Sequence, residues 1–327
     1  MKCRRGRARS GAMMLFIATA LLVSACDSVE SHPLTRDALA LGSVADSDAG
    51  EASTTSLSMD DLPRRIDAAV ALAERRGARL TVGVLDRESG TRMLGGANEP
   101  FETASTVKLF IAEEVLRQEA LGESALSDDD HDLIRSMLRS SDDYAATSLW
   151  EAYGGPEIIE RVVERHALTG TAPPDPDAWW WNTITTASDL LSWYDDLLDD
   201  TGEEAGARIV GHLMEYTDDG LDGYDQRFGL PAGLDDPVEL GVKQGWMCCL
   251  SGEWLHLSSG FFGEDHRYVV VVVAREAVTY DASDPLYETG FLPDTALYDA
   301  TTDGSAQHAR ETMTMAVETF LGSGHQR

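Results

Sequence analysis

Two hydrophobic periods alternate along the chain, and each predicts a different kind of element. Apolar residues recur at helical spacing across 60–77, which predicts an amphipathic helix that ends near Gly77. The β-branched run 80–86 and the shorter run 91–94 have a strand pattern, and the turn residues 87–90 separate them. The folded part of the chain is therefore predicted to begin with a helix followed by a β-hairpin.

The middle of the chain, from Ala104 to Met214, has mainly helical periodicity. The run 169–182 contains three prolines and three consecutive tryptophans, so it interrupts this pattern and is predicted to be a loop. The predicted helices cover 106–118, 131–140, 142–153, 156–166, 188–199 and 204–216.

Strand patterns return towards the end of the chain. Three strands are predicted at 238–244, 253–262 and 268–274, followed by a closing helix at 306–320. Tyr268 precedes five consecutive valines, a run typical of a strand that is buried on both faces. This order predicts an α+β fold, an α/β sandwich in which one antiparallel sheet is built from both chain ends and a helical region is inserted between them.

The first 26 residues have the pattern of a targeting sequence. Five basic residues before position 10 precede an uncharged, mostly apolar stretch, 11–25, which is short for a membrane span. The stretch ends in Val23-Ser24-Ala25-Cys26, which resembles the lipobox of bacterial lipoproteins, where the cysteine is lipidated and becomes the new N-terminus. We therefore expect a signal peptide at 1–25 and a lipid anchor on Cys26 at the extracytoplasmic face of the cell membrane. The alternative is an ordinary signal peptide with an incidental cysteine.

The remaining chain divides into a tether and one domain. Residues 26–58 are acidic and rich in Ser and lack sustained apolar periodicity, which predicts a flexible tether. Residues 59–327 are then a single domain with a sizeable core.

Charge and cysteine usage narrow the possible partners. The 327 residues include 57 acidic and 26 basic side chains, a formal net charge of −31, so phosphates are repelled and nucleic acid is not expected as a partner. Cys248 and Cys249 are adjacent and cannot join distant elements; two free thiols are expected in preference to a strained vicinal disulfide. No Cys/His spacing indicates a zinc site, and neither a metal nor another cofactor is expected.

Three short segments carry residues that could act together in nucleophilic catalysis. Ser105 and Lys108 lie three residues apart at the start of a predicted helix, so they share one face near the positive end of the helix dipole. A neutral lysine there could accept the serine proton, and the backbone N–H of Ser105 could hold an oxyanion. Ser141-Asp142-Asp143 lies between two predicted helices, where capping is the alternative role. Lys243-Gln244-Gly245 is predicted to close a strand.

In this order and context the three segments resemble the SxxK, SDN and KTG motifs of class A β-lactamases and penicillin-binding proteins. The resemblance extends over about residues 60–322 and includes 101–104, 137–138 and 185–190. More narrowly, Trp180-Trp181-Asn182-Thr183 together with Lys243-Gln244-Gly245-Trp246 is similar to a group of actinobacterial serine hydrolases of this fold, mostly of unassigned substrate.

The resemblance implies a role for each matching residue. Ser105 would be the acylated nucleophile and Lys108 its general base. Ser141 would pass a proton to the leaving group, and Lys243 would hold Ser141 and attract a substrate carboxylate. The oxyanion hole would consist of the backbone N–H groups of Ser105 and Trp246. The positions that bind substrate would be Asp143, Gln244, Gly245 and Trp246.

The sequence departs from the family pattern at three places. Asp143 replaces an asparagine, and its charge should favour the ammonium form of Lys108, which is a poorer base. Gln244 replaces a Thr or Ser whose hydroxyl helps to bind a β-lactam carboxylate. The loop 167–182 lacks the glutamate that class A enzymes use for deacylation; its Asp175 and Asp177 are expected to be solvated or capping residues.

The three adjacent tryptophans, 179–181, could line a substrate groove or fix the loop to the core, and we expect the second role for at least one ring.

These observations favour a cell-envelope acyl-serine hydrolase of the penicillin-recognising fold. Its substrate would be a small molecule or a peptidoglycan-like amide or ester. A β-lactamase is a weaker variant because the deacylating glutamate is missing, whereas a D-alanyl-D-alanine carboxypeptidase does not need that residue, and an esterase is a third variant. The alternative from another class is a non-enzymatic binding lipoprotein of the same fold, whose catalytic motifs have drifted.

Overall fold

The computed structural model describes residues 57–199, 204–250, 252–278, 280 and 300–322. The predicted signal peptide, Cys26 and nearly all of the predicted tether lie outside these residues, so their boundaries stay predictions. None of the described helices is long and apolar enough to cross a membrane.

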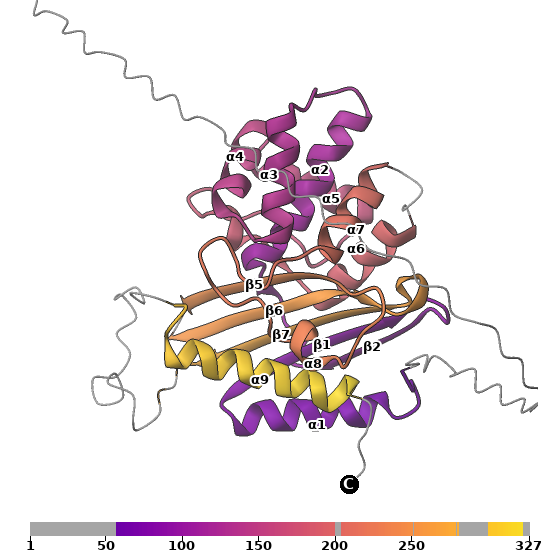
Figure 1. Ribbon diagram of the computed structural model, residues 1–327, viewed down its shortest axis with the longest axis vertical. Coiled ribbons are helices and arrows are strands. Elements are labelled where there is room, and N and C mark those ends of the chain that lie inside the picture. The colour runs from indigo at the N-terminus through magenta and orange to yellow at the C-terminus, as the bar shows by residue number, and fades with distance from the viewer. Residues whose placement is uncertain (1–56, 200–203, 251, 279, 281–299, 323–327) are drawn as a thin grey trace, which may run out of the picture. The chain divides into compact units, whose positions relative to one another are not determined.

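A five-stranded antiparallel sheet with the strand order β2-β1-β7-β6-β5 forms the middle layer (Figure 1). Its strands are β1 (Ala78–Asp86), β2 (Thr91–Gly96), β5 (Gly241–Leu250), β6 (Glu253–Phe262) and β7 (Tyr268–Ala277). β1 pairs with β7 along its whole length, with Ala78 opposite Glu276 and Asp86 opposite Tyr268. The prediction of one sheet built from both chain ends is confirmed.

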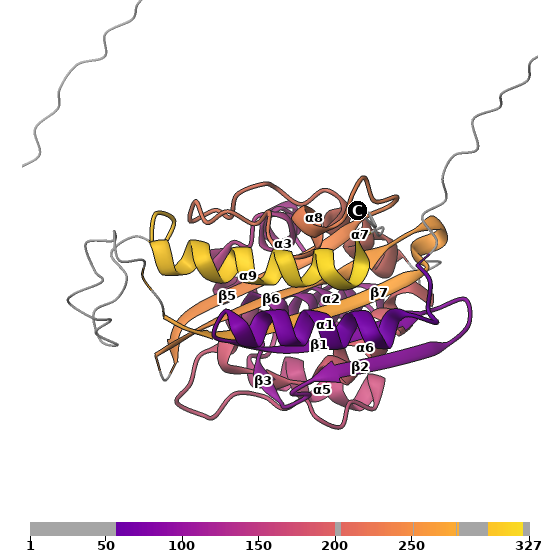
Figure 2. The same ribbon diagram turned by 90° about the horizontal axis from the view of Figure 1, so that it is seen from below.

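Helices cover both faces of the sheet. Figure 2 shows α1 (Leu62–Arg75) and α9 (Gly304–Leu321) next to each other across one face, and the two helices are in contact. The inserted helical block covers the other face and bears out the predicted helices. It consists of α2 (Lys108–Ala120), α3 (Asp128–Arg139), α4 (Asp143–Tyr153), α5 (Pro156–His166), α6 (Ala187–Asp199) and α7 (Glu204–Met214).

Several short elements connect the layers. They are too short to show a hydrophobic period, which is why the sequence did not predict them. They are the paired strands β3 (Phe101–Glu102) and β4 (Ile184–Thr185), the helix α8 (Leu230–Gly233), and the 3₁₀ turns η1 (Ala104–Val107), η2 (Trp180–Asn182) and η4 (Glu264–His266).

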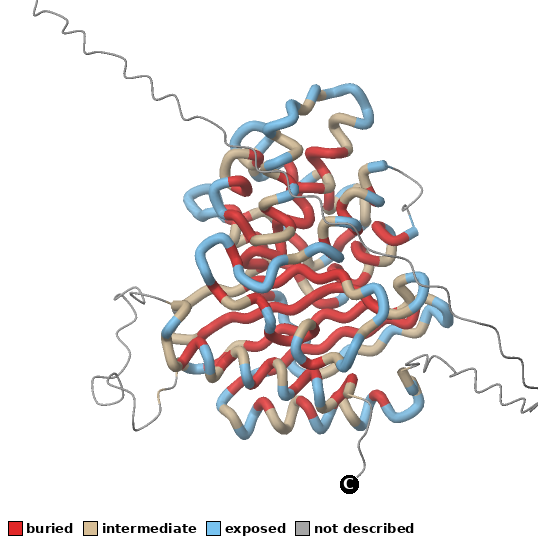
Figure 3. The backbone as a smooth tube through the Cα atoms, in the orientation of Figure 1, coloured by how far each residue is buried: buried red, intermediate tan, exposed pale blue. Residues whose placement is uncertain are grey.

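The sheet separates two hydrophobic cores, and the valine run of β7 contributes to both. Val269, Val271 and Val273 pack in the core under the helical block. Val270 and Val272 pack in the core under α1 and α9. All five are buried, as the band of buried backbone across the middle of Figure 3 illustrates. The expectation of a strand buried on both faces is correct.

Two details differ from the expectations. The strand predicted at 238–244 begins at Gly241 and continues to Leu250, so Lys243-Gln244-Gly245 lies inside β5 and does not close it. The glycine that suggested a turn allows a close approach, since a Cβ atom on Gly245 would lie 3.2 Å from the carbonyl oxygen of Thr103. Cys248 is disulfide-bonded, so the expectation of two free thiols is wrong.

Candidate active site

Ser105 lies where a strained backbone turn enters the central helix of the helical block. Ala104, which precedes it, has a φ of 44°, a conformation that side chains other than glycine rarely adopt. The 3₁₀ turn η1 then leads directly into α2. Backbone N–H groups in such a first turn have no acceptor within the helix, so the N–H of Ser105 is available to a ligand.

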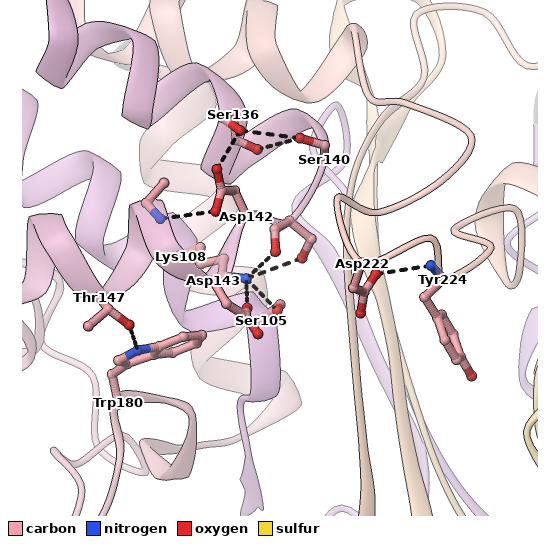
Figure 4. Close-up of polar contacts among 12 residues, drawn as sticks. Ser105, Lys108, Ser136, Ser140, Asp142, Asp143, Thr147, Trp180, Asp222 and Tyr224 are labelled. Atoms are coloured by element: carbon pink, nitrogen blue, oxygen red, sulfur yellow. Dashed lines mark hydrogen bonds and ion pairs between the residues drawn. The ribbon is translucent and has the colours of Figure 1, made fainter. Parts of the chain in front are cut away.

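The side chain of Lys108 is completely buried and converges with three acceptors (Figure 4). Its Nζ lies 2.7 Å from Ser105 Oγ, 2.6 Å from the carbonyl oxygen of Ser141 and 2.5 Å from Asp143 Oδ1. A neutral amine has two hydrogens and one lone pair. The carbonyl and the carboxylate can accept the two hydrogens, which leaves the lone pair facing the hydroxyl of Ser105. This geometry suits a general base.

Ser141 joins the two buried lysines of the site. Lys243 Nζ donates to Ser141 Oγ at 2.8 Å, and Lys108 Nζ lies 3.4 Å from the same oxygen. Ser141 has a φ of 58°, so strained backbone lies on both sides of the reacting groups. Ser105, Lys108, Ser141 and Lys243 therefore lie together, as the sequence predicts, with contacts that could relay a proton.

The edge strand β5, which passes beside Ser105, offers a second backbone N–H. Lys243 Nζ donates to the carbonyl oxygen of Gln244 at 2.8 Å, so the backbone of Gln244 faces the open side of the strand. Backbone groups alternate along a strand, and the N–H of Trp246 therefore faces the same side. Gly245 lies between them, with its Cβ position 3.4 Å from the nitrogen of Ser105. This arrangement fits an oxyanion hole made by Ser105 and Trp246.

Burial dominates the charge state of both lysines. Desolvation lowers the pKa of Lys108 below its ordinary value, while the charge and hydrogen bond of Asp143 act in the opposite direction. Desolvation, reinforced by the positive charge of Lys108, lowers the pKa of Lys243 much further. The predicted effect of Asp143 on Lys108 therefore has the right sign, but burial outweighs it.

The two aspartates between α3 and α4 have different roles. Asp142 is the N-cap of α4: its Oδ1 accepts from the N–H of Ala145 at 3.0 Å and its Oδ2 accepts from Ser136 at 2.8 Å. The side chain of Asp143 is 70% exposed and contacts Lys108. Capping fixes the turn, and Asp143 is the residue of the pair that a substrate could meet.

Gln244 and Trp246 direct their side chains away from the nucleophile. Successive side chains of a strand point to opposite faces, so Lys243 and Gln244 cannot both face Ser105. The amide of Gln244 donates to the carbonyl oxygens of Gln226 (2.8 Å) and Phe228 (2.6 Å), and its Oε1 is buried without a partner among the described residues. The ring of Trp246 stacks on Tyr224, 4.7 Å between centroids. The side chain of Gln244 is thus not presented to a substrate in this conformation, and Trp246 offers its backbone.

Gln244 is expected to contribute to folding more than to recognition. Gln244→Ala should lower the free energy of unfolding by about 2–4 kcal/mol, because it leaves two buried carbonyl oxygens without donors. Urea denaturation would measure the loss. The control Gln307→Ala removes an exposed side chain of α9 that, among the described residues, donates to Glu311, and it should cost less than about 0.5 kcal/mol. Equal effects of the two substitutions would contradict the structural role.

One of the three tryptophans fixes the loop 169–183 to the site. Trp180 is buried, donates to Thr147 Oγ1 on α4 at 3.1 Å, and has its ring 5.0 Å from Lys108 Nζ (Figure 4). The expectation that at least one ring fixes the loop to the core is confirmed. Trp179 is exposed and stacks on Trp181.

The loop 217–229, which the sequence motifs do not include, lies beside the site. The N–H of Leu221 donates to the carbonyl oxygen of Ser140 at 2.7 Å, which joins the loop to the residue before Ser141. The charge of Asp222 favours the ammonium forms of both Lys108 and Lys243. The Asp- and Gly-rich composition of this segment indicates a loop, but no local signal reveals which surface it contacts.

Other carboxylates contribute little to this centre. Asp175 and Asp177 are exposed, and within the described ranges neither side chain has a hydrogen bond or ion pair with Ser105, Lys108 or Ser141. Among the described residues, no group of three or more His, Cys, Asp or Glu side chains could hold a metal ion.

Comparisons with known proteins give one group of sequence relatives and one group of structural neighbours. No protein family model matches the chain. A curated protein of Mycobacterium tuberculosis, named "Putative lipoprotein LppW", is 44% identical over 225 residues, which cover 68% of this chain and 71% of the relative. The protein of the same name from Mycobacterium bovis has the same identity and coverage.

The structural neighbours are class A β-lactamases and related β-lactamases. A class A β-lactamase from Mycobacterium abscessus has a TM-score of 0.55 and 20% identity, and covers 79% of this chain and 98% of its own. A β-lactamase from Chitinophaga pinensis has a TM-score of 0.59 and 14% identity, covering 80% and 98%. At such low identities the similarity establishes the fold alone, and it confirms the predicted β-lactamase-like α+β fold.

Proposed function

The chain belongs to the same family as the mycobacterial lipoprotein LppW, and from this membership, its fold and its site we propose that it is an acyl-serine hydrolase of the bacterial cell envelope. Its substrate is an amide or an ester, either a small molecule or a peptidoglycan-like compound. The observation that carries the proposal is the 2.7 Å contact between Lys108 Nζ and Ser105 Oγ in a buried setting. A buried lysine with a lowered pKa beside a serine is a combination that activates a nucleophile.

Acylation follows from the contacts of the four residues. Ser105 Oγ attacks the acyl carbon while its proton passes to Lys108, and the N–H groups of Ser105 and Trp246 hold the resulting oxyanion. The tetrahedral intermediate then loses the amine or alcohol. Ser141 gives that leaving group its proton and regains one from the lysines, to which it is linked at 2.8 Å and 3.4 Å. Water finally hydrolyses the acyl-serine, so that one water is consumed and one acid and one amine or alcohol are released.

Covalent labelling tests the proposal directly. A fluorophosphonate probe should label the purified protein at one residue, Ser105, and Ser105→Ala should abolish the label. Ser140→Ala is a matched control, because Ser140 lies nearby but donates to the carbonyl oxygen of Ser136; it should be labelled normally. If the label persists in Ser105→Ala, or if neither the probe nor a panel of activated esters reacts, the non-catalytic binding alternative replaces the hydrolase.

The lipid anchor is a separate part of the proposal. Cys26→Ser should move the protein from the membrane fraction to the soluble fraction, because acyl chains supply the membrane affinity. Fractionation followed by immunoblotting would measure the change. A variant that is processed normally and stays with the membrane would contradict the anchor.

A further inference from the structure

The two lysines of the site offer little to an anionic substrate. Lys243 Nζ is bonded to Ser141 Oγ and to the carbonyl oxygen of Gln244, and Lys108 Nζ is bonded to Ser105, Ser141 and Asp143. Both amino groups are buried. The side chain after Lys243 turns away from the site, so β5 presents no hydroxyl group there either. Among the described residues, a substrate carboxylate at Lys243 would compete with Ser141 and the carbonyl oxygen of Gln244 for its N–H groups.

Two carboxylates bring negative charge to the site, opposite in sign to the charge that the two lysines can carry. Asp143 contacts Lys108 and is largely exposed, and exposed Asp222 projects from the loop 217–229 beside the site (Figure 4). The charge of Asp222 reaches both lysines. These two aspartates come from different elements, so a substrate bound at Ser105 would have negative charge near it from both the loop and the start of α4.

Asp222 is held in place by a network around it. Its Oδ1 accepts from the N–H of Tyr224 at 3.0 Å, and the N–H of its neighbour Leu221 donates to Ser140. The ring of Tyr224 stacks on Trp246, and its hydroxyl lies 2.7 Å from Nε2 of the buried His256. Burial lowers the pKa of His256 to about 3, so this imidazole is neutral and adds no positive charge beside Asp222. The loop is thus fixed to the same strand that supplies the oxyanion donor.

The reactive state is more negative than the resting state. Lys108 must lose its proton before it can accept one from Ser105. That loss removes one positive charge from beside Asp142, Asp143 and Asp222, whose negative charges all act on Lys108. A positive group on the substrate is therefore attracted most strongly in the state that reacts, and a negative group is repelled most strongly there.

We propose that the substrate of this site carries an ammonium group close to the scissile ester or amide bond, and that Asp222 is the residue that selects for it. The inference rests on the proposed hydrolase function and adds a substrate class to it. Asp222 acts through the attraction between its charge and the bound substrate. Asp143 adds to the same negative potential and also contacts the general base, Lys108.

The test compares three p-nitrophenyl esters whose acyl groups differ only at the end: trimethylammonium, tert-butyl and carboxylate. We measure the second-order rate constant for acylation of Ser105 at low and high salt. The cationic ester should react about tenfold faster than the neutral one and the anionic ester about tenfold slower, and salt should reduce both differences.

Two variants of the loop isolate the contribution of Asp222. Asp222→Asn keeps the acceptor for the N–H of Tyr224 and removes the charge, so it should lower the ratio of the cationic to the tert-butyl rate constant about three- to tenfold. The ratio cancels any change that the variant causes for all three esters through the pKa of Lys108. Asp218→Asn is the matched control, because Asp218 lies in the same loop and pairs with Arg227. It should leave the preference unchanged, which separates a local charge from the overall charge of −31.

The possible outcomes separate a failure of the proposed substrate class from a failure of the proposed hydrolase function. Acylation by all three esters at similar rates, a preference for the carboxylate, or an equal effect of Asp218→Asn would overturn the ammonium inference and leave the hydrolase intact. If none of the three esters acylates Ser105, the proposed function fails and the inference fails with it.

Discussion

Lys108→Ala slows acylation of Ser105 by about 10²- to 10⁴-fold, the usual contribution of a positioned general base. The reason is the contact at 2.7 Å: without the amine, no described group within hydrogen-bonding distance of Ser105 Oγ can take its proton. The measurement is the rate of fluorophosphonate labelling, followed on gels at several times. Lys108→Met is a second variant that preserves the length of the buried side chain. Circular dichroism of both variants separates a lost base from a lost fold, and unchanged labelling of a folded variant would refute the role of Lys108.

The pH dependence of acylation is a second test of Lys108 as the general base. Only neutral Lys108 accepts a proton, so the rate should rise with pH up to the pKa of Lys108, which burial lowers from its ordinary value. Asp143 favours the ammonium form, and Asp143→Asn should therefore move this rise to lower pH. At a pH below the pKa of Lys108, an acid dissociation constant that is about tenfold larger increases the neutral, reactive fraction of Lys108 about tenfold. A rise that stays in place or moves to higher pH would contradict the assigned base.

Turnover of β-lactams is expected to be at least about 10³-fold slower than a typical enzymatic rate of about 10 s⁻¹. Class A enzymes release a β-lactam acyl group with a glutamate that activates water, and the loop 167–182 has no glutamate. Its carboxylates, Asp175 and Asp177, are exposed and make no contact with Ser105 or Lys108 in the described part of the chain. Asp143 is already paired with Lys108. Acylation should be slow as well, because the carboxylate of a penicillin meets the negative charges of Asp222 and of Asp143, which stands where the family has an asparagine.

Mass spectrometry together with steady-state nitrocefin hydrolysis checks this expectation. A long-lived adduct on Ser105 with little product is the expected result, and Ser105→Ala should form no adduct. Turnover on the order of 10 s⁻¹ would contradict it. Asp175→Asn and Asp177→Asn would then identify which carboxylate activates water.

The fold could be predicted from the sequence because its helices and strands have strong hydrophobic periodicity. The helices of the inserted block and the hairpin at the start are close to their predicted bounds. The order of the motifs then predicted that Ser105, Lys108, Ser141 and Lys243 lie together. This prediction succeeded because a short local structure fixes each residue: a first helical turn, a capped junction or an extended strand.

The remaining features depend on long-range contacts that a local pattern does not encode. The sequence places Lys243 and Gln244 next to each other, but the alternation of a strand sends one to the nucleophile and the other to the carbonyl oxygens of Gln226 and Phe228. The loop with Asp222 is close to the site only because Leu221 bonds to Ser140 and Tyr224 stacks on Trp246. No local sequence pattern predicts either of these two contacts.

The sheet built from both chain ends sets the order in which activity can arise during synthesis. Ser105, Lys108 and Ser141 are made first, but Lys243 and the N–H of Trp246 belong to β5, which needs β6, and β6 pairs with the late strand β7. The pairing of β1 with β7 spans most of the chain, and such distant pairing is slow to form. The nascent chain therefore carries a serine and its base without an oxyanion hole. The proposed hydrolase is therefore expected to stay inert until its last strands have emerged and docked, so that an incomplete chain should not react with acyl compounds of the cell that makes it.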